Sequence, residues 1–341
     1  MGSGVTKNGV EGARATAGSV LSALRWAIAS NPVYRVVIAL VVIFAVFEGF
    51  STEFLGFFIF PGILLLGAEL ALLTMGETFV IISGEIDLSV ASVYGWGACL
   101  ALIFANMGLP YELSILVALL FGCLVGFVNW LVTVRFRVPS LITTLGTMWL
   151  LRGLLMGMFS TTFLSYTGKP SLLMSWFGGQ LAIFPRLFFW FVPLAVLFFV
   201  VLNRTKFGNW IFATGGNKEI ARALGVNTNR TKLFTFMISS VLAAFAGAAY
   251  LGRMDWFLSR LGMSSMGFGL ETEAIVASVM GGTVLTGGQG NLLAVCLAAF
   301  ALSSFRSGLI LVGVSSYWVD GMLAVLLIVF CILQGMGKAR S

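Results

Sequence analysis

The sequence predicts an all-α integral membrane protein, a polytopic bundle of about ten transmembrane helices. Hydrophobic residues make up 59% of the 341-residue chain, charged residues make up only 10%, and the mean hydropathy is +1.02. Soluble domains average about 25% charged residues. The apolar runs, such as those that begin at residues 33, 112 and 187, approach the roughly 20 residues that a helix needs to cross a bilayer. They are continuous rather than alternating, which favours helices over barrel strands.

The expected membrane spans follow one another with short connections. They lie near 33–50, 60–82, 88–107, 112–134, 140–159, 187–203, 231–252, 271–286, 291–312 and 318–335. Residues 1–30 are rich in Gly, Ser and Ala, have no apolar core, and are expected to form a cytoplasmic N-terminal tail. Residues 31–341 are expected to form one membrane domain.

Basic residues predict the orientation of these spans, because short cytoplasmic loops are enriched in Lys and Arg. An even number of spans places both termini on one side. The tail, residues 134–139, residues 203–232 and the C-terminal Lys338 and Arg340 all fall on that side. Both termini are therefore predicted to be cytoplasmic, with Arg253 and Arg260 as exceptions on the outer side.

The eighth span is weak as a transmembrane helix. It begins with Glu271 and Glu273, and it runs into a glycine-rich segment that contains Gly281, Gly282, Gly287 and Gly288. Glycine disfavours a helix interior, and irregular backbone at membrane depth is tolerated only beside protein or a water-filled cavity. The segment is therefore predicted to be a broken or re-entrant helix beside a pathway.

The stretch "IISGEIDLSVAS" at 81–92 has the same character in the first half of the chain. Its carboxylates Glu85 and Asp87 are costly in apolar surroundings unless something requires them. We expect Asp87, with the hydroxyl of Ser89, to cap a helix that restarts within the membrane; direct contact with solute hydroxyl groups is the alternative. Two interrupted segments, one in each half, also suggest an internal repeat of the kind found in transporters.

The polar stretch 203–231 contains a short predicted helix. In "GGNKEIARALGV", Gly215, Gly216 and Asn217 precede the helix and Gly225 ends it. Such a helix either lies on the lipid surface or docks into a groove of a cytoplasmic partner. No phosphate-binding loop pattern occurs in the chain.

The sequence also argues against several other classes of protein. It has no histidine and no nucleophile or metal-ligand motif, so we expect neither an enzyme nor a metal site. The four cysteines lie within apolar segments, where they are expected to be small buried hydrophobic residues. The net charge of +7 is explained by basic residues in the expected cytoplasmic loops, so no nucleic-acid partner is predicted.

Four motifs resemble the signature segments of one family and occur in the same order along the chain. "GETFVIISGEIDLSVASV" resembles the G-x-T-x-V-I-x-x-G-G-I-D-L-S-V-G-S signature of ribose/xylose-type permeases, the membrane subunits of bacterial ATP-binding-cassette (ABC) monosaccharide importers. "ATGGNKEIARALGVN" resembles their cytoplasmic loop A-x-G-G-N-x-x-A-A-x-x-x-G-I. "GFGLETEAIVASVMGGTVLTGGQGN" and "GLILVGVSSYW" resemble two further family segments, so the resemblance covers most of residues 76–318.

The resemblance implies a multi-pass subunit of the bacterial inner membrane with several partners. These are a second, identical or related, permease subunit, a cytoplasmic ATPase that binds ATP and Mg²⁺, a periplasmic substrate-binding protein, and membrane lipid. No cofactor is expected in this chain itself. Residues 31–341 would be the permease domain and 203–231 its coupling loop. The residues that match the family's coupling segment are Gly215, Gly216, Asn217, Glu219, Ala221, Arg222 and Gly225.

The predicted pathway or broken-helix residues are Glu85, Asp87, Ser89, Glu271, Glu273, Gly281, Gly282, Gly287, Gly288 and Arg306. Some positions depart from the family pattern: Glu85 replaces a glycine, and Ser307 and Ile310 stand where asparagines are common. The expected solute is a monosaccharide or related small polyol. The alternatives are another small solute, such as a branched-chain amino acid or a nucleoside, and an ion-coupled secondary transporter that uses Glu85 and Asp87.

Overall fold

The computed structural model describes residues 31–159, 163–164, 166, 171–253, 261–262, 266–315, 318–319, 321–326 and 328. The expected tail, 1–30, lies outside these residues, as do Arg260, Lys338 and Arg340. Within the described residues the chain is helical apart from loops and two short antiparallel strand pairs. This confirms the predicted fold class.

The long helices follow the expected spans closely. They are α2 (Pro32–Phe50), α3 (Phe60–Ile82), α4 (Val90–Asn106), α5 (Tyr111–Trp130), α6 (Ser140–Phe159), α8 (Arg186–Arg204), α11 (Thr228–Arg253) and α13 (Leu292–Leu311). The expected eighth span contains only a short helix, α12 (Leu270–Met280). A π-helical turn, η1 (Leu131–Arg135), extends α5. Seven of the described helices are long and apolar enough to cross a membrane, whereas α4 is slightly shorter. Half of the expected tenth span, 318–335, is described: residues 318–319, 321–326 and 328 are helical.

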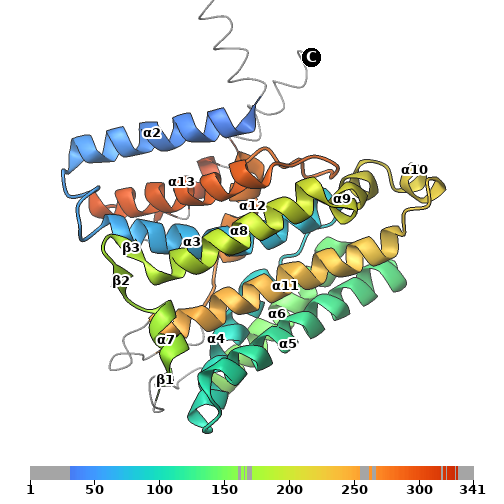
Figure 1. Ribbon diagram of the computed structural model, residues 1–341, viewed down its shortest axis with the longest axis horizontal. Coiled ribbons are helices and arrows are strands. Elements are labelled where there is room, and N and C mark those ends of the chain that lie inside the picture. Colours follow the sequence, from blue (N-terminus) through green and yellow to red (C-terminus); the bar gives the residue numbers. More distant parts are fainter. Residues whose placement is uncertain are drawn as a thin grey trace, which may run out of the picture.

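Short elements connect these helices at the two ends of the bundle. They are α7 (Leu172–Phe177), α9 (Lys206–Gly216), α10 (Lys218–Ala223), and the strands β1 (Phe163–Leu164), β2 (Gln180–Leu181), β3 (Phe184–Pro185) and β4 (Leu261–Gly262). Strand β1 pairs with β4, and β2 pairs with β3. Figure 1 places α9 and α10 at one end of the bundle and α7 with β2 and β3 toward the other.

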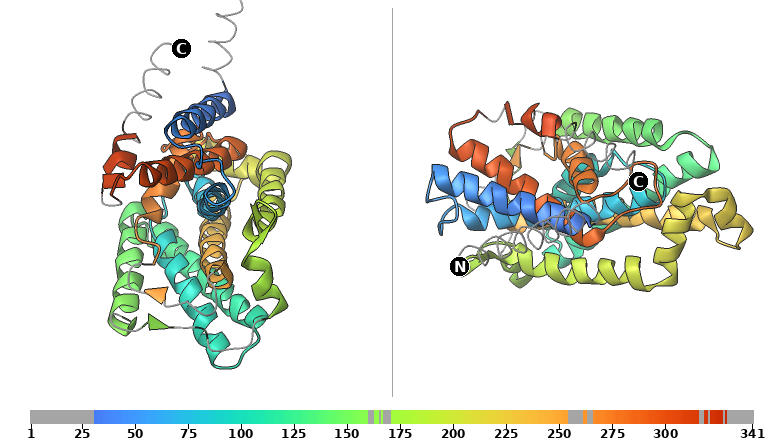
Figure 2. Two further views of the ribbon diagram at one scale, coloured as in Figure 1. Left: turned by 90° about the vertical axis from the view of Figure 1, so that its left-hand side faces the viewer. Right: turned by 90° about the horizontal axis from the view of Figure 1, so that it is seen from above.

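Helices α3 and α11 occupy the interior, and α2 and α8 lie at the periphery (Figures 1 and 2). In α3, 89% of the apolar window is buried, compared with 11% in α2 and 17% in α8. Helix α11 packs against α4 and α5 through small residues: a Cβ added to Gly126 of α5 would lie 2.6 Å from the carbonyl oxygen of Phe236. Small residues allow membrane helices to approach closely, whereas the exposed apolar side chains of α2 and α8 suit contact with lipid.

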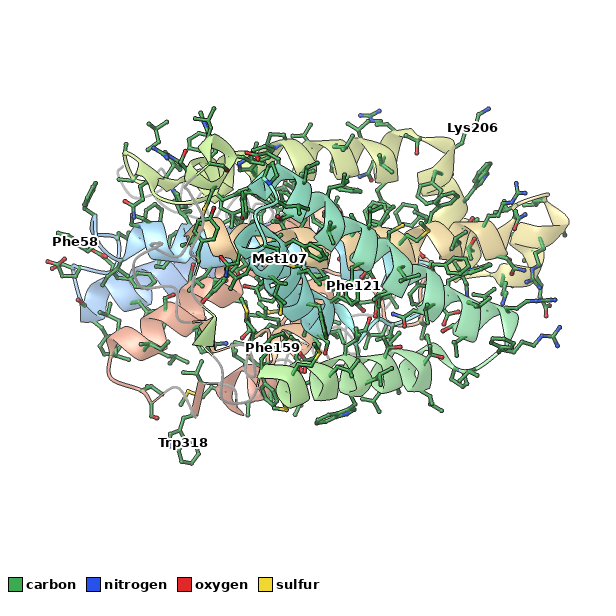
Figure 3. All side chains as sticks on the ribbon, turned by 90° about the horizontal axis from the view of Figure 1, so that it is seen from below. Phe58, Met107, Phe121, Phe159, Lys206 and Trp318 are labelled. Atoms are coloured by element: carbon green, nitrogen blue, oxygen red, sulfur yellow. The ribbon has the colours of Figure 1, made fainter. Side chains whose placement is uncertain are left out.

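The end of the bundle that carries α9 and α10, here called the α10 end, is rich in basic side chains. Exposed Arg135, Arg137, Lys218 and Arg222 lie there. In Figure 3, Lys206 projects at this end and Phe58 at the opposite end. This distribution is the pattern that the positive-inside rule associates with the cytoplasm.

Candidate functional site

Three segments that are distant in sequence meet at the α10 end through glycine backbone. They are residues 82–85 after α3, residues 215–216 at the end of α9, and residues 284–290 before α13; together we call them the glycine junction. The amide of Gly288 donates a hydrogen bond of 2.9 Å to the carbonyl of Ile82. A Cβ added to Gly288 would lie 2.6 Å from the Cα of Gly216. The predicted broken segments and the predicted coupling loop therefore form one site.

Glycine is required at this junction for both space and backbone conformation. A Cβ added to Gly215 would overlap the carbonyl oxygen of Ile82, so no other residue fits there without displacing α3. Gly84, Gly287 and Gly288 have φ values of 85°, 88° and 75°, which residues with a Cβ seldom adopt. The contact is therefore made by main-chain atoms.

Asp87 organises the restart of the chain at α4. Its Oδ1 accepts hydrogen bonds from the backbone amide of Ser89 at 3.0 Å, from the Ser89 hydroxyl at 2.6 Å, and from Asn129 of α5 at 3.4 Å. Glu77 of α3 accepts a hydrogen bond from the amide of Asp87. Asp87 thus holds a backbone amide at the beginning of α4, as expected, but Ser89 donates to Asp87 and caps no helical amide itself.

The second broken segment has a similar construction. Helix α12 ends at Met280, six residues earlier than expected, because the chain turns at Gly282, whose φ is 87°. Helix α13 then restarts with Asn291 as its N-cap, whose side chain accepts a hydrogen bond of 3.1 Å from the amide of Ala294. A helix stop, a left-handed glycine and a polar cap therefore occur in both halves; the internal repeat stays a prediction.

Glu85 forms an ion pair with Lys232 near the beginning of α11. Lys232 is only 5% exposed, and a buried ammonium group is costly unless it is paired. The pair links the first broken segment to the central helix. Glu85 and Asp87, two residues apart, thus have separate partners.

Helix α10 presents an apolar surface outward. Asn217 caps it, because its Oδ1 accepts hydrogen bonds of 3.0 Å from the amides of Glu219 and Ile220. Ile220 is 58% exposed and Leu224, just after the helix, is 78% exposed, whereas Ala221 is buried. Exposed apolar side chains on a short, capped helix suit docking to another surface.

Two further contacts fix α10 to the bundle. Arg222 donates hydrogen bonds to Thr228 at 2.9 Å and to Asn229 at 3.0 Å, both in the first turn of α11. Gly225, with a φ of 84°, makes the reversal between α10 and α11.

Comparisons with known proteins identify the family. Residues 59–331 match the family described as "Branched-chain amino acid transport system / permease component". The chain belongs to this permease family. A protein named "Autoinducer 2 import system permease protein LsrC" from Photorhabdus laumondii is 33% identical over 78% of each chain. The protein of that name from Yersinia enterocolitica is 32% identical over 78% of this chain and 72% of its own. No solved structure matches the chain.

Family membership confirms that the chain is a multi-pass permease of the ABC importer type, a transport subunit rather than an enzyme. Permeases of this type work with a separate ATPase and a binding protein. Among the described residues, no group of His, Cys, Asp or Glu side chains could hold a metal ion.

The other predicted carboxylates of the permease lie in the first turn of α12, one helix length away from the glycine-rich segment that follows α12. Glu271 lies 3.7 Å from Arg152 of α6, and Glu273 pairs with Arg306 of α13. The guanidinium of Arg152 also lies 4.6 Å from the ring centre of Phe268. These pairs join α12 to its neighbours. They stand about 15 Å from Gly281, the length of α12, so the residues predicted for the pathway form two separate groups.

Two residues of the permease site were missed from the sequence. Asn129 also donates to the Ser89 hydroxyl at 2.8 Å and accepts from Thr147 of α6, and Lys232 pairs with Glu85. Each had a signal: Asn129 is a lone amide in the apolar run "GFVNWLV", and Lys232 lies just inside an expected span. A polar side chain in such a position requires a partner, but its identity depends on the tertiary fold.

Proposed function

We propose that this permease is the translocation subunit of an ATP-driven importer that carries a monosaccharide or related small polyol inward across the inner membrane. It receives the solute from a periplasmic binding protein and docks through α10 onto a cytoplasmic ATPase, which binds ATP and Mg²⁺. A second permease subunit completes the pathway, and both termini lie in the cytoplasm.

The observation that carries the proposal is the connection between α10 and the glycine junction. Ile220 and Leu224 offer an exposed apolar surface, and α9, which leads directly into α10, ends at the Gly215 and Gly216 contact with both broken segments. A partner that pulls on α10 would act on Ile82 and Gly288 through backbone contacts. Differential binding of the two ATPase states to α10 would then shift the permease between inward-facing and outward-facing arrangements.

The names of the relatives suggest candidates for the solute. The LsrC proteins are named for the import of autoinducer 2, which makes that molecule the first one to test. The family description names branched-chain amino acids, which makes amino acids the second candidate class.

The proposal is tested by reconstituting the permease in liposomes with its ATPase and binding protein. Hydrolysis of ATP is measured with autoinducer 2, pentoses, hexoses and branched-chain amino acids. We expect stimulation by one of the sugar-like solutes, and loss of that stimulation in Glu219→Arg, because the substitution reverses a charge on the exposed side of α10. Lys206→Glu is the matched control, since it reverses an exposed charge at the same end of the bundle but outside α10.

Two outcomes would contradict the proposal. Stimulation by an amino acid alone would leave the docking role intact and change the solute class. Uptake by the permease alone, driven by an ion gradient without ATP, would instead favour a secondary transporter and overturn the main assignment.

A further inference from the structure

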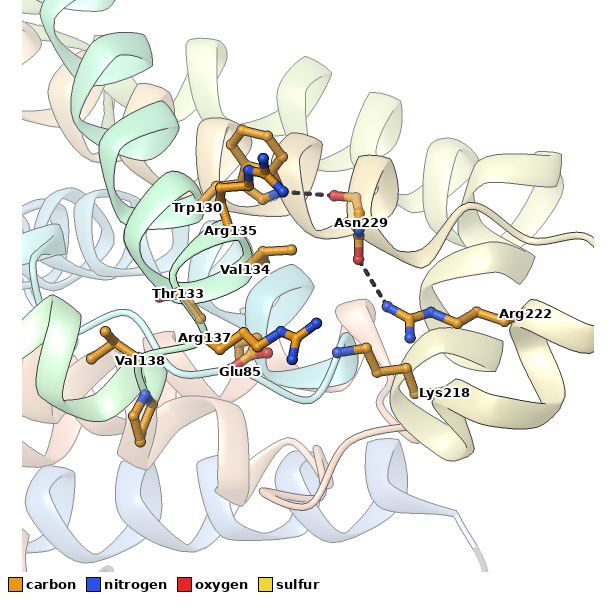
Figure 4. A pocket seen from close by; sticks show the side chains of 11 residues that line it. Glu85, Trp130, Thr133, Val134, Arg135, Arg137, Val138, Lys218, Arg222 and Asn229 are labelled. Carbon is orange, nitrogen blue, oxygen red and sulfur yellow. Dashed lines mark hydrogen bonds between the residues drawn. The ribbon is translucent and has the colours of Figure 1, made fainter.

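A cavity of about 520 Å³ lies between η1 and α10, beside the first turn of α11. We call it the basic pocket. Its lining includes Thr133, Arg135, Arg137, Lys218 and Arg222, together with Glu85, Trp130 and Asn229. Figure 4 shows that Arg137 and Lys218 approach the pocket from opposite sides and point toward one another. Two cations that face each other across a cavity form a site for an anion.

The charges of the basic pocket are not balanced within the described part of the chain. Its carboxylate, Glu85, is paired with Lys232. In the described residues, Arg135, Arg137 and Lys218 have no ion-pair partner. The pocket therefore has a net positive charge from Arg135, Arg137, Lys218 and Arg222.

The titration of Lys218 reflects this excess of positive charge. Its pKa lies below the ordinary value of a lysine, first because of partial burial and then because of the nearby cations Lys232, Arg222 and Arg137. Glu85 opposes this shift only in part. A bound anion would relieve the repulsion among these groups.

Thr133 provides an independent indication of a missing ligand. The side chain lines the pocket and is only 7% exposed, yet its hydroxyl has no hydrogen-bond partner among the described residues. A buried hydroxyl without a partner is destabilising. An acceptor oxygen bound beside Thr133 would supply the missing partner.

The walls of the pocket are held in place by local structure. The π-helical turn η1 carries Thr133 and Arg135, and such insertions often occur at functional sites. Arg137, which follows η1, has a left-handed φ of 60°. On the other side, Asn229 accepts hydrogen bonds from Trp130 at 2.8 Å through its carbonyl and from Arg222 through its side chain.

We propose that the basic pocket binds the phosphate group of a cytoplasmic anion. Guanidinium groups bind phosphate oxygens with two parallel hydrogen bonds, and the ammonium of a lysine adds a compact charge. The volume also accommodates a small phosphate ester. The phosphate belongs either to a soluble ester or to the headgroup of an anionic lipid at the membrane surface. Lys218 and Arg222 belong to α10, so the pocket adjoins the docking surface formed by Ile220 and Leu224. The proposal does not depend on the nature of the transported solute.

The test measures binding by the purified full-length permease. In a neutral detergent, glycerol 3-phosphate is titrated by calorimetry at constant ionic strength, with glycerol as the uncharged comparison. In nanodiscs, the midpoint of thermal unfolding is compared between phosphatidylcholine alone and phosphatidylcholine mixed with phosphatidylglycerol. Binding in the first experiment identifies a soluble ester, and stabilisation only in the second identifies a lipid headgroup.

Substitutions in the basic pocket test whether the phosphate group binds there. We expect Arg137→Ala combined with Lys218→Ala to weaken binding about tenfold or more, because two charge-assisted contacts are lost. Lys206→Ala, which removes an exposed cation outside the pocket, is the matched control and should keep the wild-type affinity. Thr133→Val separates weaker binding from a folding defect, because it removes only an unpartnered hydroxyl. The variant should unfold at or above the wild-type temperature and still bind the phosphate group less tightly.

The proposal is overturned if neither probe binds the wild-type protein. It is also overturned if Lys206→Ala weakens binding as much as the double variant, which would indicate nonspecific attraction, or if neither the double variant nor Thr133→Val affects binding.

Discussion

Asp87 and Glu85 lie in the same short segment but serve different local structures. Asp87 binds donors within its own segment and on α5. Glu85 reaches across to Lys232 on α11, 147 positions away in sequence. The role of Asp87 at the start of α4 could be predicted from the sequence, because its main partner, the amide of Ser89, is only two residues away. The partner of Glu85 could not be predicted, because only the folded chain brings α11 beside this segment.

The role of Asp87 leads to a first prediction, on stability. Asp87→Ala leaves the buried amide and hydroxyl of Ser89 without an acceptor, which costs about 1 to 3 kcal/mol for each unsatisfied group. Asp87→Asn keeps an acceptor oxygen in the same place and should cost much less. Thermal unfolding in detergent distinguishes the two. Equal destabilisation by both substitutions would show that the negative charge, rather than the acceptor oxygen, is what matters.

The ion pair between Glu85 and Lys232 allows a second prediction. Glu85→Gln leaves the charge of Lys232 buried without a carboxylate, and loss of one partner of a buried pair typically costs about 3 to 5 kcal/mol. Since Glu85 is partly exposed, we expect the lower part of this range. Adding Lys232→Gln should recover part of the loss. A double-mutant cycle based on unfolding midpoints measures the coupling between Glu85 and Lys232. Strictly additive effects of the two substitutions on stability would show that the two side chains are not coupled.

At the scale of elements, the positions of the long helices could be predicted because their apolar length is set by the bilayer. The end of α12 was predicted less accurately than the ends of the other helices. Apolar sequence continues after Met280, but the turn at Gly282 stops the helix earlier than expected. The glycine-rich segments were each recognised as irregular. That they touch one another and the end of α9 was missed, because glycine carries no side-chain pattern that identifies its neighbours.

The glycine junction gives a third prediction. A methyl group at Gly215 would overlap the carbonyl of Ile82, whereas one at Gly216 would meet only the Cα of Gly288 at 3.9 Å. Gly215→Ala should therefore displace α9 from α3, lower the melting temperature and abolish solute-stimulated ATP hydrolysis. Gly216→Ala, its neighbour at the end of the same helix, should be nearly neutral in both measurements. Normal coupling in Gly215→Ala would mean that the junction does not transmit movement.

At the scale of the whole molecule, the distribution of charge gives the bundle two different ends. Basic side chains gather at the α10 end, and the ion pairs of Glu271 and Glu273 lie deeper in the bundle, about 15 Å along α12 from Gly281. Loop charges in the sequence were sufficient to predict this asymmetry, since it depends only on the order of spans and loops. The separation of the predicted pathway residues into two groups required the structure, because both groups flank the same short helix, α12.

Orientation provides a fourth prediction. Met107, which is 71% exposed, follows the last residue of α4, a helix that starts beside the first broken segment and runs away from it, whereas Lys206 projects at the α10 end (Figure 3). In spheroplasts, a membrane-impermeant maleimide should label Met107→Cys without permeabilisation and Lys206→Cys only after it. The wild-type protein serves as the control for labelling of native cysteines. The reverse pattern would place the termini outside.

The glycine junction also has a consequence for exchanging parts between relatives. Its contacts are made by backbone atoms. Whether a coupling loop fits therefore depends on the backbone conformation of the three segments and not on the identity of particular side chains. A chimera that receives residues 203–231 from another permease should therefore work only if the host has glycine at the positions of Gly84, Gly287 and Gly288. Where those glycines are present, coupling loops should be interchangeable between importers of unrelated solutes.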